Sequence, residues 1–169
     1  MIEQQQSGFD ELNQEDIQDL QTYVGPQSDR YVERWQRIEP QKSSMSWNWA
    51  AFIFSFMWFG YRKIHFVPVL FLFSLIILDY LFHFAFGEEM IGGLVAGVHV
   101  VLALLANKLY FDNAIKKTLH IQRQFPNQEV RDKVLKSRGG TSWRWAALYL
   151  LIFIFHYLIL GTIKADGEL

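Results

Sequence analysis

Apolar and polar residues are segregated along this chain into separate blocks. Apolar residues fill 64–86, 90–106 and 143–163 with few interruptions, whereas 1–45 and 107–142 are rich in charged side chains. A helix that crosses the hydrocarbon core of a bilayer, about 30 Å thick, needs about 20 mainly apolar residues. The pattern therefore predicts an all-α integral membrane protein with three transmembrane helices at these three blocks.

A further apolar stretch, 46–61, is shorter and contains three of the six tryptophans. Its uncharged part, 47–61, makes a helix of about 22 Å, which is less than the hydrocarbon thickness. Tryptophan favours the membrane–water interface, where one side of its ring is apolar and the other is wet. We therefore expect a short interfacial or re-entrant helix here, with a fourth membrane span as the alternative.

The same patterns divide the chain into a soluble acidic tail, 1–45, and a membrane domain, 46–169. In the tail, apolar residues three to five apart predict a helix that ends at Gly25-Pro26. We expect this acidic helix to be solvated. The alternative is that it docks on a partner, or on the basic loop of its own chain.

A second helix is expected in the tail after Ser28. It places Tyr31 and Trp35 on one face, and basic side chains on another. Aromatic residues beside basic ones suit an anionic membrane surface. In the loop 107–142, Asn127 is placed to cap a short helix that Gly139-Gly140 ends.

Charge is distributed unevenly, although the net charge of the 169 residues is only −1. Residues 1–29 carry seven acidic side chains and no lysine or arginine, whereas 107–143 carries eight basic and three acidic ones. Positive charge is retained on the cytoplasmic side of a membrane. We therefore expect the basic loop to be cytoplasmic and the C-terminus to lie outside. The side of the N-terminus depends on whether 47–61 crosses.

Four polar residues within the predicted spans are the candidate intramembrane site: Asp79, His83, His99 and His156. Helical rise places all four in the outer half of the membrane. Burying such groups in hydrocarbon is costly unless they are paired. We expect an Asp–His hydrogen bond that orders the helices. The alternatives are a divalent metal, a proton relay, or a haem held by a pair of histidines.

Other features limit the classes of function. The chain has no cysteine, which excludes disulfides and thiolate metal sites. It has no phosphate-binding loop, metalloprotease helix or serine-nucleophile motif, so we expect no enzymatic activity and no cofactor. His65 and His120 are expected at the surface. The basic loop has no nucleic-acid motif, and we expect Lys116, Lys117 and Arg123 to meet the phosphates of anionic lipids instead.

Gly93 and Gly97 form a small-xxx-small pair in the second predicted span. Such pairs let two helix backbones approach closely in lipid. We expect a helix-packing face here, within one chain or between copies.

Several motifs occur in a characteristic order: Gly25-Pro26, Tyr31-x3-Trp35, SWNWAAF at 46–52, Tyr61-Arg62-Lys63, Asn107-Lys-Leu-Tyr110 and Gly139-Gly-Thr-Ser142. In this order they resemble the bacterial membrane-protein family known as domain of unknown function 2628. The most specific residues of the resemblance are Trp47, Asn48, Trp49, Tyr61, Arg62 and Lys63. Members of that family more often carry Gly-Pro where this chain has Ser55-Phe56.

The resemblance implies a small inner-membrane protein without an established activity, and it supplies no catalytic residues. We expect a non-enzymatic scaffold or accessory subunit, or a homo-oligomer, that contacts partners or anionic lipid at the cytoplasmic face. The alternative is a small transporter or channel component, or a metal- or haem-binding membrane protein, that uses Asp79 and the intramembrane histidines.

Overall fold

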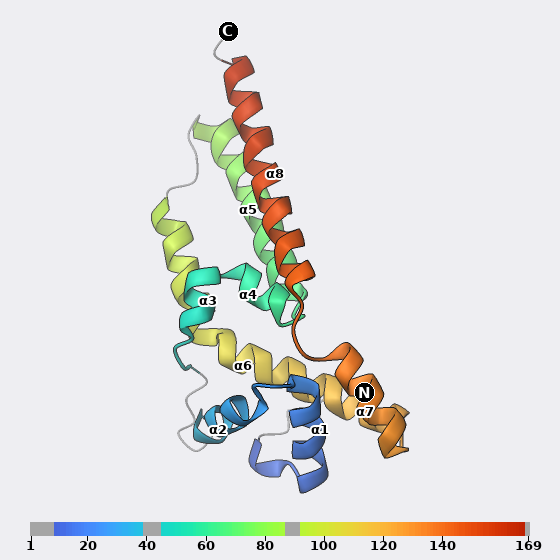
Figure 1. The fold of residues 1–169 in the computed structure, drawn as a ribbon. Coiled ribbons are helices and arrows are strands. Elements are labelled where there is room, and N and C mark those ends of the chain that lie inside the picture. The colour runs from blue at the N-terminus through green and yellow to red at the C-terminus, as the bar shows by residue number, and fades with distance from the viewer. Residues whose placement is uncertain (1–8, 39–44, 87–91, 168–169) are drawn as a thin grey trace, which may run out of the picture. The chain divides into compact units, whose positions relative to one another are not determined.

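The computed structural model describes residues 9–38, 45–86 and 92–167, and these contain helices and no strand (Figure 1). The predicted all-helical fold is therefore confirmed. In chain order the elements are η1 (Phe9–Glu11), α1 (Gln14–Val24), α2 (Ser28–Ile38), α3 (Trp49–Phe54), α4 (Phe56–Tyr61), α5 (Phe66–Phe86), α6 (Gly92–Gln124), α7 (Gln128–Arg138) and α8 (Trp143–Gly167).

These helices form two compact units. The first, here the polar unit, comprises Met1–Asn48 and Ala103–Thr141; the second, the apolar unit, comprises Trp49–Leu102 and Ser142–Leu169. The sequence pattern divided the chain near residue 46 and grouped the basic loop with the membrane domain. The structure groups that loop with the N-terminal helices, because α1 and α2 pack on its side chains.

Helix α1 begins at a capping box, in which Asn13 accepts a hydrogen bond from the Asp16 amide (2.9 Å) and donates one from its own amide to the Asp16 carboxylate (3.1 Å). Its apolar stripe buries Leu20, Tyr23 and Val24. The expectation of a solvated helix is wrong, because α1 packs on α7 of the chain's own basic loop.

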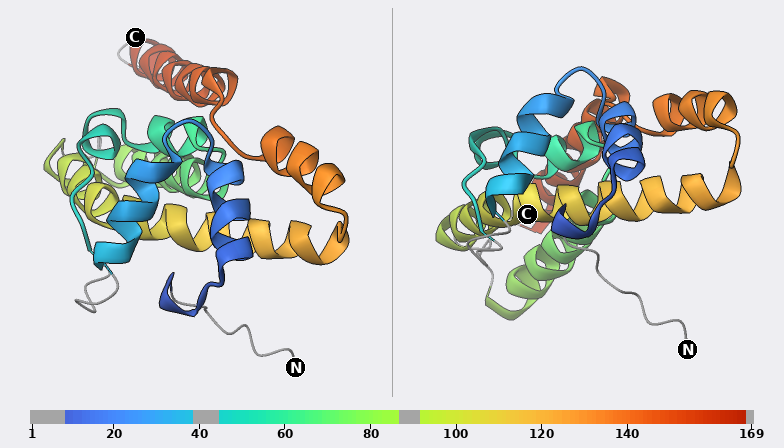
Figure 2. Two further views of the ribbon diagram at one scale, coloured as in Figure 1. Left: turned by 60° about the horizontal axis from the view of Figure 1, so that its bottom comes forward. Right: turned by 90° about the horizontal axis from the view of Figure 1, so that it is seen from below.

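In the polar unit α2 lies against α6 (Figure 2), and aromatic side chains form the core between them. Tyr31 meets Tyr110 edge to face at 5.0 Å, and Trp35 lies 5.3 Å from the ring of Phe111. Trp35 is only 2% exposed. This aromatic face is covered by the chain itself, which corrects the expectation that it lies on a membrane surface.

The tryptophan-rich stretch forms two six-residue helices, α3 and α4, rather than one. They part at Ser55, whose backbone has φ 46° and ψ −128°. This is a conformation that glycine adopts freely and that strains other residues. The break therefore divides the predicted interfacial helix.

In the apolar unit, α4 and α5 both pack on α8 (Figure 1). The ring of Phe56 stacks on Phe71 at 4.9 Å and lies 5.4 Å from Phe153, and Phe56 forms one buried cluster with Leu72 and Tyr149. Rings of this size supply most of the apolar area that such short helices can bury. The core of the unit therefore lies where these three helices meet.

Among the residues that the structure describes, two helices are long and apolar enough to cross a membrane, judged by length and composition alone. They are Ala96–Gln124, which is most of α6, and Gln128–Thr162, which contains α7 and most of α8. The stretch Phe66–Phe82 of α5 is a shorter apolar helix.

Candidate functional site

Asn107 of α6 is the centre of a buried polar junction in the polar unit. Its side-chain oxygen accepts hydrogen bonds from Asn48 (2.9 Å) and Arg34 (3.4 Å). Its amide nitrogen donates to the hydroxyl (2.7 Å) and the carbonyl (3.2 Å) of Ser46. A carboxamide can accept two hydrogen bonds and donate two. All four are made, so a fully buried polar group is satisfied.

Main-chain bonds extend this junction. The indole of Trp35 donates to the Asn107 carbonyl at 3.1 Å. The amides of Ser46 and Asn48 donate to the carbonyls of Leu104 and Ala103, each at 3.1 Å. These bonds fix the segment that precedes α3 along α6.

A second junction lies where α1 ends. The Gly140 amide donates to the carbonyl of Tyr23 at 2.7 Å, and Gly140 has φ 68°. A Cβ atom on Gly139 would lie 2.0 Å from that same carbonyl oxygen. Only glycine permits this approach, because any other side chain would occupy the space of the Tyr23 backbone.

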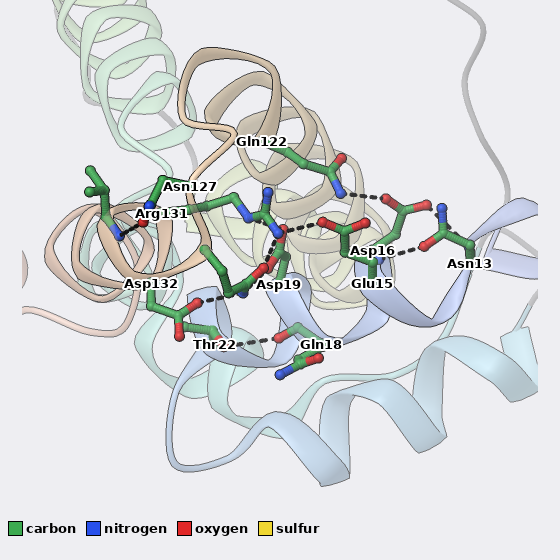
Figure 3. Close-up of polar contacts among 12 residues, drawn as sticks. Asn13, Glu15, Asp16, Gln18, Asp19, Thr22, Gln122, Asn127, Arg131 and Asp132 are labelled. Atoms are coloured by element: carbon green, nitrogen blue, oxygen red, sulfur yellow. Dashed lines mark hydrogen bonds and ion pairs between the residues drawn. The ribbon is translucent and has the colours of Figure 1, made fainter.

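Charged side chains hold α1 against α7, as Figure 3 shows. The buried guanidinium of Arg131 pairs with Asp19 at 2.8 Å and with Glu15. Gln128 donates to Asp19 at 3.2 Å. Burial raises the pKa of Asp19 above its ordinary value, against the opposing effects of Gln128 and Arg131. These contacts dock the acidic helix on the basic loop.

In the apolar unit, Tyr61-Arg62-Lys63 ends α4 with a Schellman motif. The Ile64 amide donates to the Phe59 carbonyl (2.8 Å) and the Lys63 amide to the Gly60 carbonyl (3.0 Å). Lys63 takes the left-handed position, with φ 59°. The motif turns the chain from α4 into α5.

The same turn is attached to the start of α8. The Ser142 amide donates to the Tyr61 carbonyl at 2.8 Å, and the rings of Tyr61 and Trp143 lie 4.8 Å apart. A Cβ atom on Gly60 would lie 2.6 Å from the Tyr149 ring. Gly60 therefore lets α4 lie close to α8.

The predicted intramembrane site contains one described pair. Nε2 of His156 on α8 lies 3.0 Å from Oδ2 of Asp79 on α5, and both side chains are buried. The rings of Tyr157 and Tyr80 lie 5.2 and 6.1 Å from His156. His99 packs edge to face on Phe71 at 6.3 Å.

The fourth member of that site, His83, lies in α5, and its side chain is outside the described set. No group of three or more potential metal ligands occurs among the residues that the structure describes. The described geometry is thus a buried carboxylate–imidazole pair between two apolar helices. Such a pair can share a proton between its oxygen and nitrogen atoms.

The remaining candidate residues are dispersed. Gly97 of α6 is exposed, with no atom within 4 Å of an added Cβ, and the surroundings of Gly93 are outside the described set. Lys116 and Arg123 are exposed on α6, whereas Lys117 is half-buried.

The six signature residues differ in burial: Asn48 and Arg62 are buried, Trp47, Tyr61 and Lys63 are half-buried, and Trp49 is exposed. His120 is exposed, whereas His65 is half-buried, with Nδ1 3.0 Å from the Tyr149 hydroxyl.

A family model described as "Protein of unknown function (DUF2628)" matches residues 11–115. The chain belongs to this family. The comparisons with curated proteins and with solved structures give no match. The suspected resemblance is therefore confirmed over the part of the chain that runs from α1 into α6.

The DUF2628 motifs mark places where segments are joined. Trp35, Asn48 and Asn107 meet at the junction in α6, and Lys63 forms the left-handed turn after α4. Gly139, beyond the matched residues, gives α1 its close approach. These residues thus make contacts within each of the two units.

The sequence patterns did not indicate the roles of three residues on which these junctions depend. Asn107 makes four side-chain hydrogen bonds, Arg131 is a buried cation, and Gly60 lies against the ring of Tyr149. Asn107 appeared only within a motif. A buried arginine gives no local signal, because its partners Glu15 and Asp19 are more than a hundred residues away.

Proposed function

We propose that this member of DUF2628 is a small, non-enzymatic integral membrane protein of the bacterial inner membrane. Its apolar unit lies in the bilayer, and its polar unit serves as a cytoplasmic scaffold or accessory module. The proposed spans are α5, the first part of α6, and α8. The basic loop lies on the cytoplasmic side and the C-terminus outside.

The observation that carries this proposal is the exposure of α8. Large apolar side chains cover most of its circumference, with Leu151 62% and Phe155 63% exposed. Buried positions form a narrow stripe, which includes Ala146, Tyr149 and His156. Exposed apolar surface of this extent is unfavourable in water and suits hydrocarbon. α5 supports the proposal, because its exposed side chains include Leu70, Phe73 and Phe84.

The broken aromatic stretch supports three spans rather than four. Each of α3 and α4 has six residues, and a helix of that length is about 9 Å long. Neither is long enough to cross a hydrocarbon core of about 30 Å. We propose that they lie at the cytoplasmic interface, which places the N-terminus in the cytoplasm.

The absence of cysteine makes topology simple to test. We expect the chain to remain in the membrane after alkaline carbonate extraction. In intact cells, Ser137→Cys on α7 should be protected from a membrane-impermeant maleimide, and Thr162→Cys near the end of α8 should react. Reaction of Ser137→Cys without permeabilisation, or release of the chain by carbonate, contradicts the proposal.

The scaffold role is tested by assembly. We expect the protein in mild detergent to purify with another membrane protein or as a homo-oligomer. A monodisperse monomer with no partner contradicts this role and leaves the membrane topology standing.

The Asp79–His156 pair favours a second candidate function, an ion- or proton-coupled transport component. Ionisable groups buried among apolar helices commonly mark such pathways. Proton flux into proteoliposomes that disappears in Asp79→Asn supports this candidate, and the same low flux in the wild type and the variant excludes it.

A further inference from the structure

Basic and aromatic residues occur where α4 ends, in the turn that leads to α5, and at the start of α8. We define the interfacial cluster as Tyr61, Lys63, Trp143, Arg144 and Trp145. Its two segments are joined by the Ser142–Tyr61 main-chain bond of 2.8 Å and by the 4.8 Å contact between the rings of Tyr61 and Trp143. The two segments that carry the cluster are thus joined within the apolar unit.

A third contact orders the cluster. The ring of His65 meets the ring of Trp145 at 4.5 Å, and its Nδ1 lies 3.0 Å from the Tyr149 hydroxyl. Trp145 is therefore held by His65, the residue before α5, although 41% of its surface is exposed. Trp143 is 73% exposed. Exposed indoles beside apolar helices suit the level of lipid headgroups.

The charge of this region is wholly positive along the chain. No aspartate or glutamate occurs in 40–78 or in 133–165, the two segments that supply the cluster. Buried Arg62 adds a further positive charge, with its guanidinium 5.7 Å from the centre of the Tyr61 ring. Burial lowers the pKa of Lys63, so an anion beside this ammonium group would stabilise its charged form.

The start of α8 contributes a further positive field. The first amides of a helix have no partner within the helix and carry the positive end of its dipole. Lys63 follows Tyr61 by two residues, and Arg144 follows Ser142 by two. The Ser142–Tyr61 bond therefore brings the segments that carry both cations to the beginning of α8.

We propose that the interfacial cluster binds the phosphate of an anionic phospholipid of the phosphatidylglycerol class. Lys63 and Arg144 contact the phosphate, and Trp143 and Trp145 lie beside the glycerol and the first methylenes. The site rests on the proposed function, because it requires α5 and α8 to lie in a bilayer. It is distinct from the headgroup contacts expected of Lys116, Lys117 and Arg123.

The test is lipid binding by the purified full-length protein, measured by native mass spectrometry in detergent. The protein is titrated with phosphatidylglycerol and, separately, with phosphatidylcholine. We expect a preference for phosphatidylglycerol that falls about fivefold for each cation removed in Lys63→Gln and Arg144→Gln. Phosphatidylcholine binding should not change. Lys63→Arg should retain the preference, which separates loss of charge from disturbance of the turn.

Two control variants sharpen the result. Lys133→Gln, at an exposed lysine of α7, should leave the preference unchanged. If the triple variant of Lys116, Lys117 and Arg123 abolishes the preference and the cluster variants do not, the proposal is overturned. Equal binding of both lipids by the wild type also overturns it. Displacement of phosphatidylglycerol by equimolar glycerol phosphate assigns the site to a soluble phosphate instead.

The outcomes separate this inference from the proposed function. Release of the chain by alkaline carbonate contradicts membrane insertion and the lipid site together. Retention in the membrane, with lipid preference unaffected in the cluster variants, contradicts the lipid site alone.

Discussion

The side chains of Asn48 and Asn107 are joined by a buried hydrogen bond of 2.9 Å across 59 residues of the chain. It connects the segment before α3 to the middle of α6. Both residues belong to motifs of the DUF2628 family. Their pairing joins two parts of the matched stretch that lie far apart along the chain.

Replacing Asn107 should disrupt this junction. Asn107→Ala removes the hydrogen bonds that Asn107 makes with Ser46 and with buried Asn48, and the loss of hydrogen bonds from buried polar groups costs about 1–3 kcal/mol each. We expect the free energy of unfolding to fall by about 3 kcal/mol, measured by denaturant titration of the purified protein. Lys116→Ala, at an exposed position of the same helix, is the control and should change it by less than about 0.5 kcal/mol.

Replacing Ser55 should stabilise the protein. Its φ of 46° favours glycine, and its buried hydroxyl has no hydrogen-bond partner among the described residues. We expect Ser55→Gly to raise the unfolding midpoint, by an amount equivalent to about 1 kcal/mol. Ser55→Ala removes the hydroxyl but keeps the backbone strain, so it should give a smaller gain. A loss of stability in Ser55→Gly contradicts the strained turn.

Two glycines should respond differently to replacement by alanine. At Gly139 a Cβ atom would lie 2.0 Å from the Tyr23 carbonyl oxygen, whereas at Gly161 of α8 nothing lies within 4 Å. We expect Gly139→Ala to lower the free energy of unfolding by more than about 2 kcal/mol. Gly161→Ala should leave it equal or raise it by up to about 1 kcal/mol. Thermal unfolding of the two variants side by side checks both.

Tyr23 should make the polar unit sensitive to alkaline pH. Burial raises its pKa from 10.0 to about 12, against an opposing effect of Asn113. Between these values the unfolded chain loses the phenolic proton and the folded chain keeps it, so stability falls as pH rises. We expect Tyr23→Phe to remove up to about 2.7 kcal/mol of this loss. Parallel pH dependences of unfolding in the wild type and Tyr23→Phe would contradict the shift.

Gly97 tests assembly between copies. Its exposed position accepts a larger side chain without a clash in the described chain. If copies pack through Gly93 and Gly97, Gly97→Leu should shift the oligomer toward monomer by at least about tenfold in dissociation constant. Light scattering after size-exclusion chromatography in detergent measures this. Gly161→Leu, at another open helical glycine, is the matched control, and an unchanged oligomer excludes this face.

Local sequence patterns predicted the helices well. The predicted block 64–86 corresponds to α5, Phe66–Phe86. Asn127 caps α7 as predicted, accepting a hydrogen bond from the Val130 amide at 3.1 Å. These features depend on neighbouring residues: apolar periodicity selects the helix, and a side-chain oxygen selects its first turn.

The partners of these helices were not predictable in the same way. The thin stripe on α1 favours a solvated helix, because no neighbouring residue indicates that Arg131 will meet its carboxylates. Likewise Asp79 finds His156, which lies 77 residues later, rather than a neighbour on its own helix. No glycine or proline at Ser55 or Phe56 indicates the break between α3 and α4. The backbone conformation of Ser55 therefore depends on surrounding contacts.

The docking of α1 also sets an order of events during translation. Glu15 leaves the ribosome 116 residues before Arg131, and at about 5–20 residues per second this interval lasts roughly 6–23 s. Gly139 and Gly140, which contact the Tyr23 carbonyl, are synthesised later still. During synthesis the residues of α1 therefore lack their partners in α7 and at Gly139-Gly140, and they stay accessible to chaperones until most of the chain has been made.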